Sequence, residues 1–413
     1  MTVALGTMLA PLNSTMIAVA LPRVVDAFDT TVASAAWLVT GYLVAMASLQ
    51  PIAGKIGDRL GRRRLVLVGL ALFGLVSLGA AVAPNLWLLL TFRGLQGMAG
   101  ALVIPSGTAL VRDVVPAERR ARAFGLIGAA AGVAAALGPL LGGVLIEAAG
   151  WRAIFYVNLA LVGPALLLAR RWLPRDAPSG DSLRIDAVGA VMLAVILGTF
   201  VWLLTSLSTG ISPVVPAVAG PAVVALAVVF AIRETRHPDP IIPPGLFRRR
   251  SFAAACGAIG LGNLAMYTLL LSVPLLLAGR SGASSSQTGL VLSSLSVPMI
   301  LFAPVGGRLA DRFGRRLPTS AGLALVVGGT LSPALIGAGI ALPALIPSLA
   351  LVGAGLGLSM PGLQTTAVES VASRQAGVAA GVFSTSRYLG SIVGAAVLVA
   401  FLGADGSDVG GLA

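Results

Sequence analysis

The sequence is poor in the residues from which metal sites, disulfides and hydrolytic centres are built. It has one cysteine, Cys256, and one histidine, His237, while aromatic residues make up 5% of the chain and charged residues 10%. One cysteine excludes an internal disulfide framework and a cysteine metal cluster. One histidine excludes a histidine-based metal site, and the sequence also lacks a phosphate-binding P-loop. We therefore expect no enzyme activity, no cofactor and no metal.

Apolar residues are abundant instead. Hydrophobic residues make up 57% of the 413 positions, and the chain contains 52 glycines and 25 prolines. A soluble domain cannot bury that much apolar surface, whereas a lipid bilayer solvates it. Frequent glycine and proline are typical of closely packed and bent membrane helices. The composition therefore predicts an all-α membrane protein that contacts the lipid bilayer.

Apolar runs of about twenty residues recur along the chain, and each is long enough to cross the hydrocarbon core. We interpret the first run as a retained helix, because it lacks the basic leader of a signal peptide. The thirteen predicted membrane helices are residues 2–22, 33–54, 65–83, 86–109, 121–147, 152–169, 187–206, 214–233, 252–278, 286–306, 318–338, 342–363 and 375–403.

The net charge of +13 is compatible with nucleic-acid binding, but the distribution of the basic residues argues against it. Most of them form short clusters in alternate loops between apolar runs, as in the cytoplasmic loops of a multi-pass membrane protein. This asymmetry predicts a cell-membrane protein with a cytoplasmic N-terminus and no nucleic-acid partner. The sequence leaves the oligomeric state open, a monomer included.

One charged eleven-residue motif occurs twice. Residues 54–64 read G-K-I-G-D-R-L-G-R-R-R, and residues 307–317 read G-R-L-A-D-R-F-G-R-R-L. Such a repeat between apolar segments indicates two related membrane halves with matching loops on one side. Four helices follow the first copy before a longer polar loop, and three follow the second before the chain stops. The predicted helices 187–206 and 214–233 have no counterparts, so we interpret them as an inserted pair.

The acid within each motif suggests a gate. A carboxylate at a helix end can accept hydrogen bonds from a neighbouring helix N-terminus and pair with a base, which fixes two helices in one conformation. We expect Asp113 to be the partner of Arg59 or Arg62. The alternative is an orientation signal that contacts lipid head groups. The predicted gating residues are Gly54, Asp58, Arg59, Gly61, Arg62, Asp113, Gly307, Asp311, Arg312, Gly314 and Arg315.

Together these motifs resemble the major facilitator superfamily, and in particular its fourteen-spanner drug:proton antiporter branch (EmrB/QacA-type). The sequence Leu89-x-x-x-Arg93-x-x-Gln96-Gly97 is similar to the family's fourth-helix motif. The stretches 151–158 and 234–252 are similar to segments of the fourteen-helix branch. The fifth predicted helix resembles the antiporter motif, in which glycine, alanine and proline stand at fixed spacing: Gly125, Ala134, Gly138, Pro139, Gly142 and Gly143.

The resemblance implies a major-facilitator-type helical bundle with an N-terminal half at 1–170, an inserted pair at 171–250 and a C-terminal half at 251–413. It also implies that one further helix is missing after the thirteenth. The implied function is secondary active efflux of an amphipathic organic compound, cationic or neutral, in exchange for protons by alternating access. Arg93 would take part in proton coupling, and the fifth helix would form a bending interface.

One position departs from the family pattern. Residues 12–22 resemble L-D-x-T-I-V-N-x-A-L-P, but Asn13 stands where the carboxylate is expected. Asparagine cannot exchange a proton, so Asn13 either contacts a ligand or braces helices. This departure keeps open a metabolite exporter or facilitator without proton coupling, and a non-transporting truncated homologue that acts as a scaffold. The polar candidates for substrate binding are Asn13, Gln96, Asn158, Asn263, Tyr267, Gln287 and Gln364.

Overall fold

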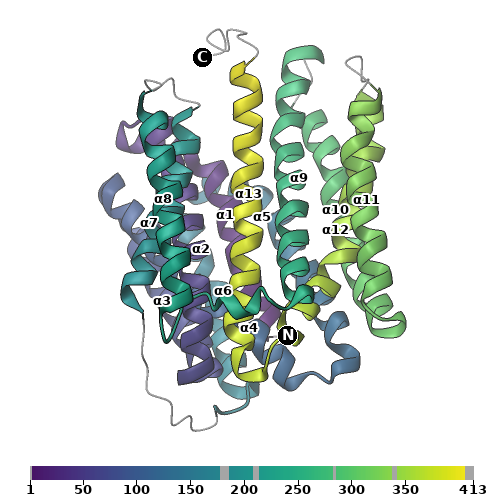
Figure 1. Cartoon of the computed structure of the whole chain (residues 1–413). Helices are drawn as coiled ribbons and strands as arrows, with labels where there is room; N and C mark the ends of the chain where they lie inside the picture. Colours follow the sequence, from purple (N-terminus) through teal and green to yellow (C-terminus); the bar gives the residue numbers. More distant parts are fainter. Residues whose placement is uncertain (1, 177–185, 208–213, 282–284, 337–341, 405–413) are drawn as a thin grey trace.

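The computed structural model of the chain describes residues 2–176, 186–207, 214–281, 285–336 and 342–404, and these residues form a bundle of long α-helices (Figure 1). The described helices are α1 (Thr2–Phe28), α2 (Val32–Leu60), α3 (Arg62–Ala81), α4 (Leu86–Val114), α5 (Arg120–Ala149), α6 (Ala153–Trp172), α7 (Ala187–Leu207), α8 (Val214–Arg236), α9 (Arg250–Ser281), α10 (Ser285–Phe313), α11 (Arg316–Ile336), α12 (Leu342–Glu369) and α13 (Ala376–Ala404). Single 3-10 turns, η1 (Ala117–Arg119), η2 (Pro244–Leu246) and η3 (Ser373–Gln375), precede α5, α9 and α13.

Each predicted helix corresponds to an observed one, but several extend beyond the apolar run. The helix α2 continues from residue 54 to Leu60, and α10 continues from residue 306 to Phe313. The charged motif residues therefore belong to helices, because they are adequate helix formers once they have left the apolar core. Gly61 and Gly314 follow these helix ends with φ angles of 109° and 81°. Glycine adopts this conformation at little cost, which explains its position in both motifs.

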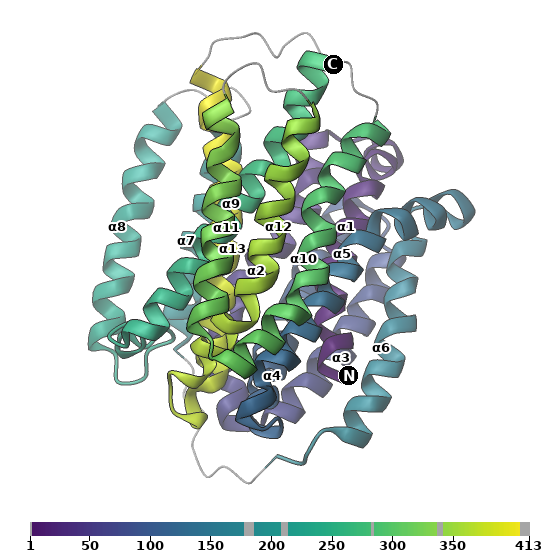
Figure 2. The ribbon, with the colours of Figure 1, turned by 90° about the vertical axis from the view of Figure 1, so that its right-hand side faces the viewer.

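The helices form two related groups with a pair beside them. The first group contains α1 to α6 and the second contains α9 to α13, while α7 and α8 pack against each other and α7 contacts α2. Figures 1 and 2 show this pair at the periphery of the bundle. Ten helices in the described part of the chain are long and apolar enough to cross a membrane, and Ala187–Leu203 is a shorter apolar helix. The predicted all-α fold with two halves and an inserted pair is confirmed, whereas its boundaries at 170 and 250 stay predictions.

Contacts between the two halves follow the repeat. The principal helix pairs across the interface are α2 with α13 and α5 with α10. Because α10 repeats α2 and α13 repeats α5, the two pairs are related by the internal duplication. Both motifs lie at the same end of the bundle, which we call the motif end (residues 54–64 and 307–317, lower in Figure 1).

An ionic contact joins the two helices of the inserted pair. The carboxylate of Asp186 accepts a hydrogen bond from Gly189 N at the start of α7 (2.9 Å) and pairs with Arg233 of α8 (2.7 Å). The hydrogen bond from Arg233 lowers the pKa of Asp186 to about 2 although burial opposes the shift. Since the pKa is depressed, this carboxylate contributes to stability at neutral pH, and the contribution is lost only as pH falls from about 4 towards 2.

Glycines let the two halves approach closely at the motif end. A Cβ atom added at Gly381 of α13 would collide with the backbone oxygen of Gln50 on α2. We expect Gly381→Ala to destabilise the protein by about 1–3 kcal/mol, because neither backbone can move without disturbing the interface. Thermal unfolding of the purified protein, followed by the reaction of buried Cys256 with a thiol-reactive dye, should show a lower Tm.

The matched control for this measurement is Gly163→Ala in α6, where an added Cβ has nothing within 4 Å. That variant should keep the Tm of the natural sequence or raise it slightly, because alanine favours helix more than glycine. Equal Tm values for the two variants would contradict a close interface at Gly381.

Candidate functional site

At the motif end, a carboxylate of the first half caps a helix of the second half. The two Asp58 oxygens accept hydrogen bonds from Gly377 N and Val378 N, each 3.0 Å long, in the first turn of α13. These backbone N–H groups have no partner within their own helix, and they lie at the positive end of its dipole. Asp58 therefore joins the halves by charge and by hydrogen bonds.

Arg62 fixes the position of this carboxylate. It lies one helical turn after Asp58, donates to Asp58 Oδ1 at 2.7 Å, and pairs with Asp113 at the end of α4. The same guanidinium donates to the backbone oxygen of Ser373 in the second half. Arg62 is thus the predicted partner of Asp113, and it connects three helix ends.

The second motif makes the same contact in the opposite direction. The two oxygens of Asp311 accept hydrogen bonds from Ala121 N at 3.0 Å and Arg122 N at 2.9 Å, in the first turn of α5. Asp311 stands 253 positions after Asp58 in the sequence. The halves are therefore joined by two related caps, each of which uses a carboxylate of one half and a helix N-terminus of the other.

The arginine of the second motif also has its acidic partner. Arg315 pairs with Glu369 at the end of α12, and Glu369 also accepts a hydrogen bond from Arg120 of the first half at 2.8 Å. Glu369 occupies in α12 the position that Asp113 occupies in α4. Sequence analysis missed Glu369, although the repeat could have located it as the acid at the end of the helix that corresponds to α4.

Arg59, the other predicted partner of Asp113, binds elsewhere. Its guanidinium pairs with Asp239 in the loop after α8 at 2.7 Å, and Lys55 pairs with the same carboxylate at 2.7 Å. Burial acts to raise the pKa of Asp239, but the hydrogen bonds and charges of Arg59 and Lys55 outweigh it and leave the pKa below its usual value. This loop therefore connects the first motif to the inserted pair. Arg312 of the second motif lies over the ring of Phe313.

The glycines of the predicted antiporter motif lie at two helix interfaces. Gly125 lies against the backbone oxygen of Ala303 on α10, across the interface between the halves. Gly138 and Gly142 lie against α1, within the first half. The helix α5 thus contacts the opposite half at the motif end and its own half farther along. The remaining motif positions belong to the same continuous helix: Ala134, Pro139 and Gly143.

The helix α13 repeats this glycine spacing, which sequence analysis missed. Gly381, Gly390 and Gly394 have the same separations as the motif positions 125, 134 and 138. Each lies so close to a backbone oxygen that an added Cβ would collide with it. These oxygens are, in the same order, those of Gln50 on α2 and of Gly260 and Leu264 on α9. The helices α5 and α13 are therefore equivalent in sequence and in contacts.

Arg93 lies completely buried among groups that carry no negative charge. Its Nε donates to the backbone oxygen of Leu38 at 2.9 Å, and its Nη1 donates to the side-chain oxygens of Asn13 and of Gln96, the latter at 3.0 Å. The Tyr42 ring lies 4.4 Å from the guanidinium carbon. These amide, carbonyl and aromatic groups stabilise the cation by partial charges, but none of them neutralises it.

The cluster extends to α3 and α6 and contains buried polar atoms without partners. Gln96 and Asn158 both donate to the hydroxyl of Ser77, at 2.7 and 3.3 Å. Three buried atoms, Arg93 Nη2, Tyr42 Oη and Asn158 Oδ1, have no hydrogen-bond partner among the described residues. Asn13, Gln96 and Asn158 were predicted as substrate ligands. The structure places all three inside the first half, where Asn13 and Gln96 bind Arg93 and Asn158 joins them through Ser77.

The other predicted polar residues are dispersed. Asn263 donates to the backbone oxygen of Ile259 in its own helix at 3.0 Å. Gln364 donates to the hydroxyl of Thr108 at 3.3 Å, across the interface between the halves. The side chain of Gln287 lies outside the described part of the structure. Tyr267 on α9 interacts with Arg387, Tyr388 and Ser391 of α13.

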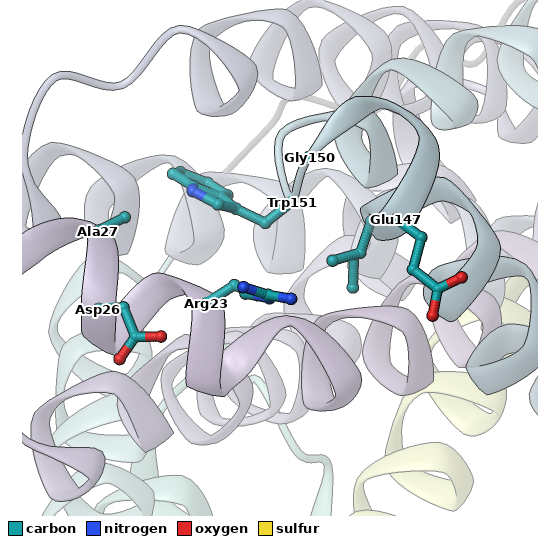
Figure 3. A pocket seen from close by; sticks show the side chains of 7 residues that line it. Arg23, Asp26, Ala27, Glu147, Gly150 and Trp151 are labelled. Carbon is teal, nitrogen blue, oxygen red and sulfur yellow. The ribbon is translucent and has the colours of Figure 1, made fainter.

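A pocket of about 540 Å³ opens at the end of the bundle opposite the motifs (Figure 3). In Figure 3 the Arg23 side chain extends from α1 between Trp151 and the end of α5, which carries Glu147. Sequence analysis did not identify this pocket, because its residues come from the ends of separate helices. The lining residues are Arg23, Asp26, Ala27, Ile146, Glu147, Gly150 and Trp151.

Two related groups of helices, α1 to α6 and α9 to α13, joined through a duplicated charged motif, define a transporter class. Residues 3–395 match the model of the Major Facilitator Superfamily. The chain is 36% identical over 394 residues to the uncharacterized MFS-type transporter YvkA of Bacillus subtilis. The aligned region covers 95% of this chain and 88% of YvkA. It is 34% identical to the multidrug resistance protein Stp of Mycobacterium tuberculosis, over 97% of this chain and 74% of Stp.

A solved structure shows the same fold. The human organic anion transporter MFSD10 (TETRAN) superimposes with a TM-score of 0.71 at 20% sequence identity, over 97% of this chain and 92% of that one. The chain therefore belongs to the major facilitator superfamily and is a multi-pass membrane transporter, not an enzyme. The fourteen-helix branch and a missing last helix stay predictions.

The two caps can be tested as the contacts that hold the motif end closed. In a background with Cys256→Ala, a cysteine at the buried position Val371 reports opening by its reaction with a maleimide. We expect Asp58→Asn and Asp311→Asn each to raise the labelling rate of detergent-purified protein by about tenfold. An amide retains one acceptor but loses the charge that the helix N-terminus stabilises.

Asp176→Asn is the matched control. Its carboxylate caps the N-terminus of α3 through Arg63 N and Arg64 N, each at 2.9 Å, within a single half. This variant should label at the natural rate. If it labels as fast as Asp58→Asn, the increase reflects general loosening of the motif end and not separation of the halves.

Proposed function

We propose that this transporter exports amphipathic organic compounds from the cytoplasm by alternating access, in exchange for protons. The observation that supports it most directly is the pair of reciprocal caps, Asp58 on α13 and Asp311 on α5. Both must break for the motif end to open, and both can reform without covalent chemistry. Such a contact suits a gate, because it is strong when closed and reversible.

The proposal places the motif end in the cytoplasm of the cell, with the N-terminus on the same side. The support is the concentration of arginine and lysine in the loops at this end. With this orientation, the described conformation is closed towards the cytoplasm. A transport cycle would release the caps, admit cargo from the cytoplasm, and reform the caps before cargo leaves on the other side.

The cargo class is supported by relatives. Stp is named as a multidrug resistance protein, and its match covers 97% of this chain. A midplane site between two halves that is built mostly of apolar helices also favours compounds with a large apolar body. We therefore propose small amphipathic organic molecules as substrates. We also propose that the duplicated glycines of α5 and α13 form the contacts that flex when the halves rock.

A second candidate is export without proton coupling, and one contact favours it. Asn13, which replaces the family's carboxylate, binds Arg93 through an amide oxygen that cannot take up a proton. Under this candidate the Arg93 cluster braces α1, α2 and α4, and the cargo gradient alone drives movement. The two candidates differ in whether transport moves protons.

Proteoliposomes that contain a pH-sensitive dye separate these candidates. For a set of fluorescent amphiphiles with one ring system and different head groups, we expect transport of at least one to change the luminal pH. Arg93→Ala should abolish this pH change, and Asn13→Asp should increase it, because a carboxylate beside a guanidinium can exchange a proton.

Three other outcomes would be informative. Cargo movement without a pH change, together with a pH change in Asn13→Asp alone, would establish the uncoupled exporter. A pH change that survives Arg93→Ala would contradict a coupling role for Arg93. Failure of every amphiphile to move would contradict export itself and favour a scaffold.

Orientation has its own test. Single cysteines at Arg63 and at Arg316, next to the two motif glycines and in a Cys256→Ala background, should resist a membrane-impermeant maleimide in intact cells. Both should react after the cells are opened. A cysteine at the exposed outer position Trp87 is the control and should react in intact cells. Labelling of the motif positions from outside would reverse the proposed topology.

A further inference from the structure

The membrane interior of this protein carries positive charge that its own acidic residues do not balance. Arg93 and Arg387 lie well inside α4 and α13. In the described part of the chain, every acidic residue lies between helices or among the last three residues of a helix. The ion pairs of the described residues accordingly involve helix ends and loops, and they include neither Arg93 nor Arg387.

Arg387 lies on a face of α13 that is turned towards the first half. It follows the start of α13 at Ala376 by eleven residues, or about 16 Å of helix. Ala380, two turns earlier on the same face, packs with Val111 and Phe124 of the first half. Residues seven apart share a helix face, so Arg387 points to the region between the halves, farther from the motif end than the caps.

The surroundings of Arg387 differ from those of Arg93. Arg93 is fully buried and held by three oxygen acceptors, which anchor it inside one half. Arg387 is only half-buried, and its guanidinium carbon lies 5.0 Å from the Tyr388 ring, while Tyr267 of α9 lies within electrostatic range of its charge. Its hydrogen bond to Tyr388 Oη is long, at 3.5 Å. The N–H groups of Arg387 are therefore available to a ligand.

A cation in this position favours one type of ligand. A guanidinium at low dielectric is costly without a counter-ion, and its planar donors match the two oxygens of a carboxylate. The rings of Tyr267 and Tyr388 supply an apolar surface beside it. The buried charge of Arg93 adds attraction for anions and repulsion for cations.

We propose that the cargo carries an acidic group, and that Arg387 donates hydrogen bonds to its carboxylate while the apolar body lies against Tyr267 and Tyr388. This inference rests on the proposed export function and specifies its substrate class. It differs from the family resemblance, which implies cationic or neutral cargo. The difference arises because Asn13 replaces a carboxylate, and no other carboxylate of the described residues lies well inside a helix.

Binding to the purified protein in lipid nanodiscs tests the proposal. Three probes share a pyrene ring and a four-carbon chain and differ only in charge: 1-pyrenebutanoate, 1-pyrenebutanamide and 4-(1-pyrenyl)butylammonium. Energy transfer from tryptophan to pyrene reports their affinities. We expect the butanoate to bind about tenfold more tightly than the amide, the size of one hydrogen bond to a charged group, and the ammonium to bind most weakly.

Variants assign the effect to Arg387. Arg387→Gln should lower butanoate affinity about tenfold and leave amide affinity unchanged, whereas Arg387→Lys should retain most of the butanoate affinity. Arg152→Gln is the control. It removes a cation that lies over Trp151, at the end of the bundle opposite the motif end, and it should change neither the butanoate nor the amide affinity. Because the amide binds without a charge, unchanged amide affinity also shows that Arg387→Gln remains folded.

The outcomes separate this inference from export. If the ammonium binds most tightly, or if Arg387→Gln keeps the butanoate affinity, the anionic site is wrong, while export of other amphiphiles can still stand. If butanoate binding depends on Arg387 but proteoliposomes move none of the three probes, the anion site stands and the proposed export function falls.

Discussion

The capping of a helix N-terminus by a carboxylate from the opposite half is the contact on which this architecture depends. Asp58 and Asp311 each accept two backbone N–H bonds of about 3 Å. The rest of the motif serves this contact. In the first motif, Arg62 fixes the carboxylate, whereas Arg315 of the second motif pairs with Glu369. Glycine at residues 61 and 314 lets the chain turn, and small residues let the backbones meet. Hydrogen bonds to charged groups contribute about 1.5–3 kcal/mol each, so the two caps help to hold the halves together at the motif end.

The duplication makes the two caps, and the helices that they cap, equivalent. The helices α5 and α13 begin at a cap from the opposite half, pass close to its backbone at Gly125 and Gly381, and then pack against α1 or α9 of their own half. Glycine at these positions lets each helix approach the backbones of both halves closely, because no side chain stands between them. Of these two helices only α5 contains a proline, Pro139, so a bend at that point is not shared by α13.

Features that depend on neighbouring residues were predicted from the sequence more completely than contacts between residues far apart in it. The helices, the two motifs and the inserted pair were predictable because apolar runs and an eleven-residue repeat can be read directly from the sequence. The helix ends were placed too early, since charged residues stop an apolar run but do not stop a helix. Glu369, Asp239 and the glycines of α13 were missed, because their partners are distant in the sequence. Asn13 and Arg93 were both singled out, but only the fold showed that they bind each other.

Replacing one carboxylate by an amide alters the whole interior. An ionised acid at position 13 would pair with Arg93 and leave the buried cluster around it without net charge. With asparagine, the guanidinium keeps its full charge in a region of low dielectric, where charges act over longer distances than in water. The neutral oxygens around Arg93 make its burial tolerable but do not cancel its field. The amide at position 13 therefore removes a proton carrier and leaves the Arg93 cation held by neutral oxygens, with no acidic partner among the described residues.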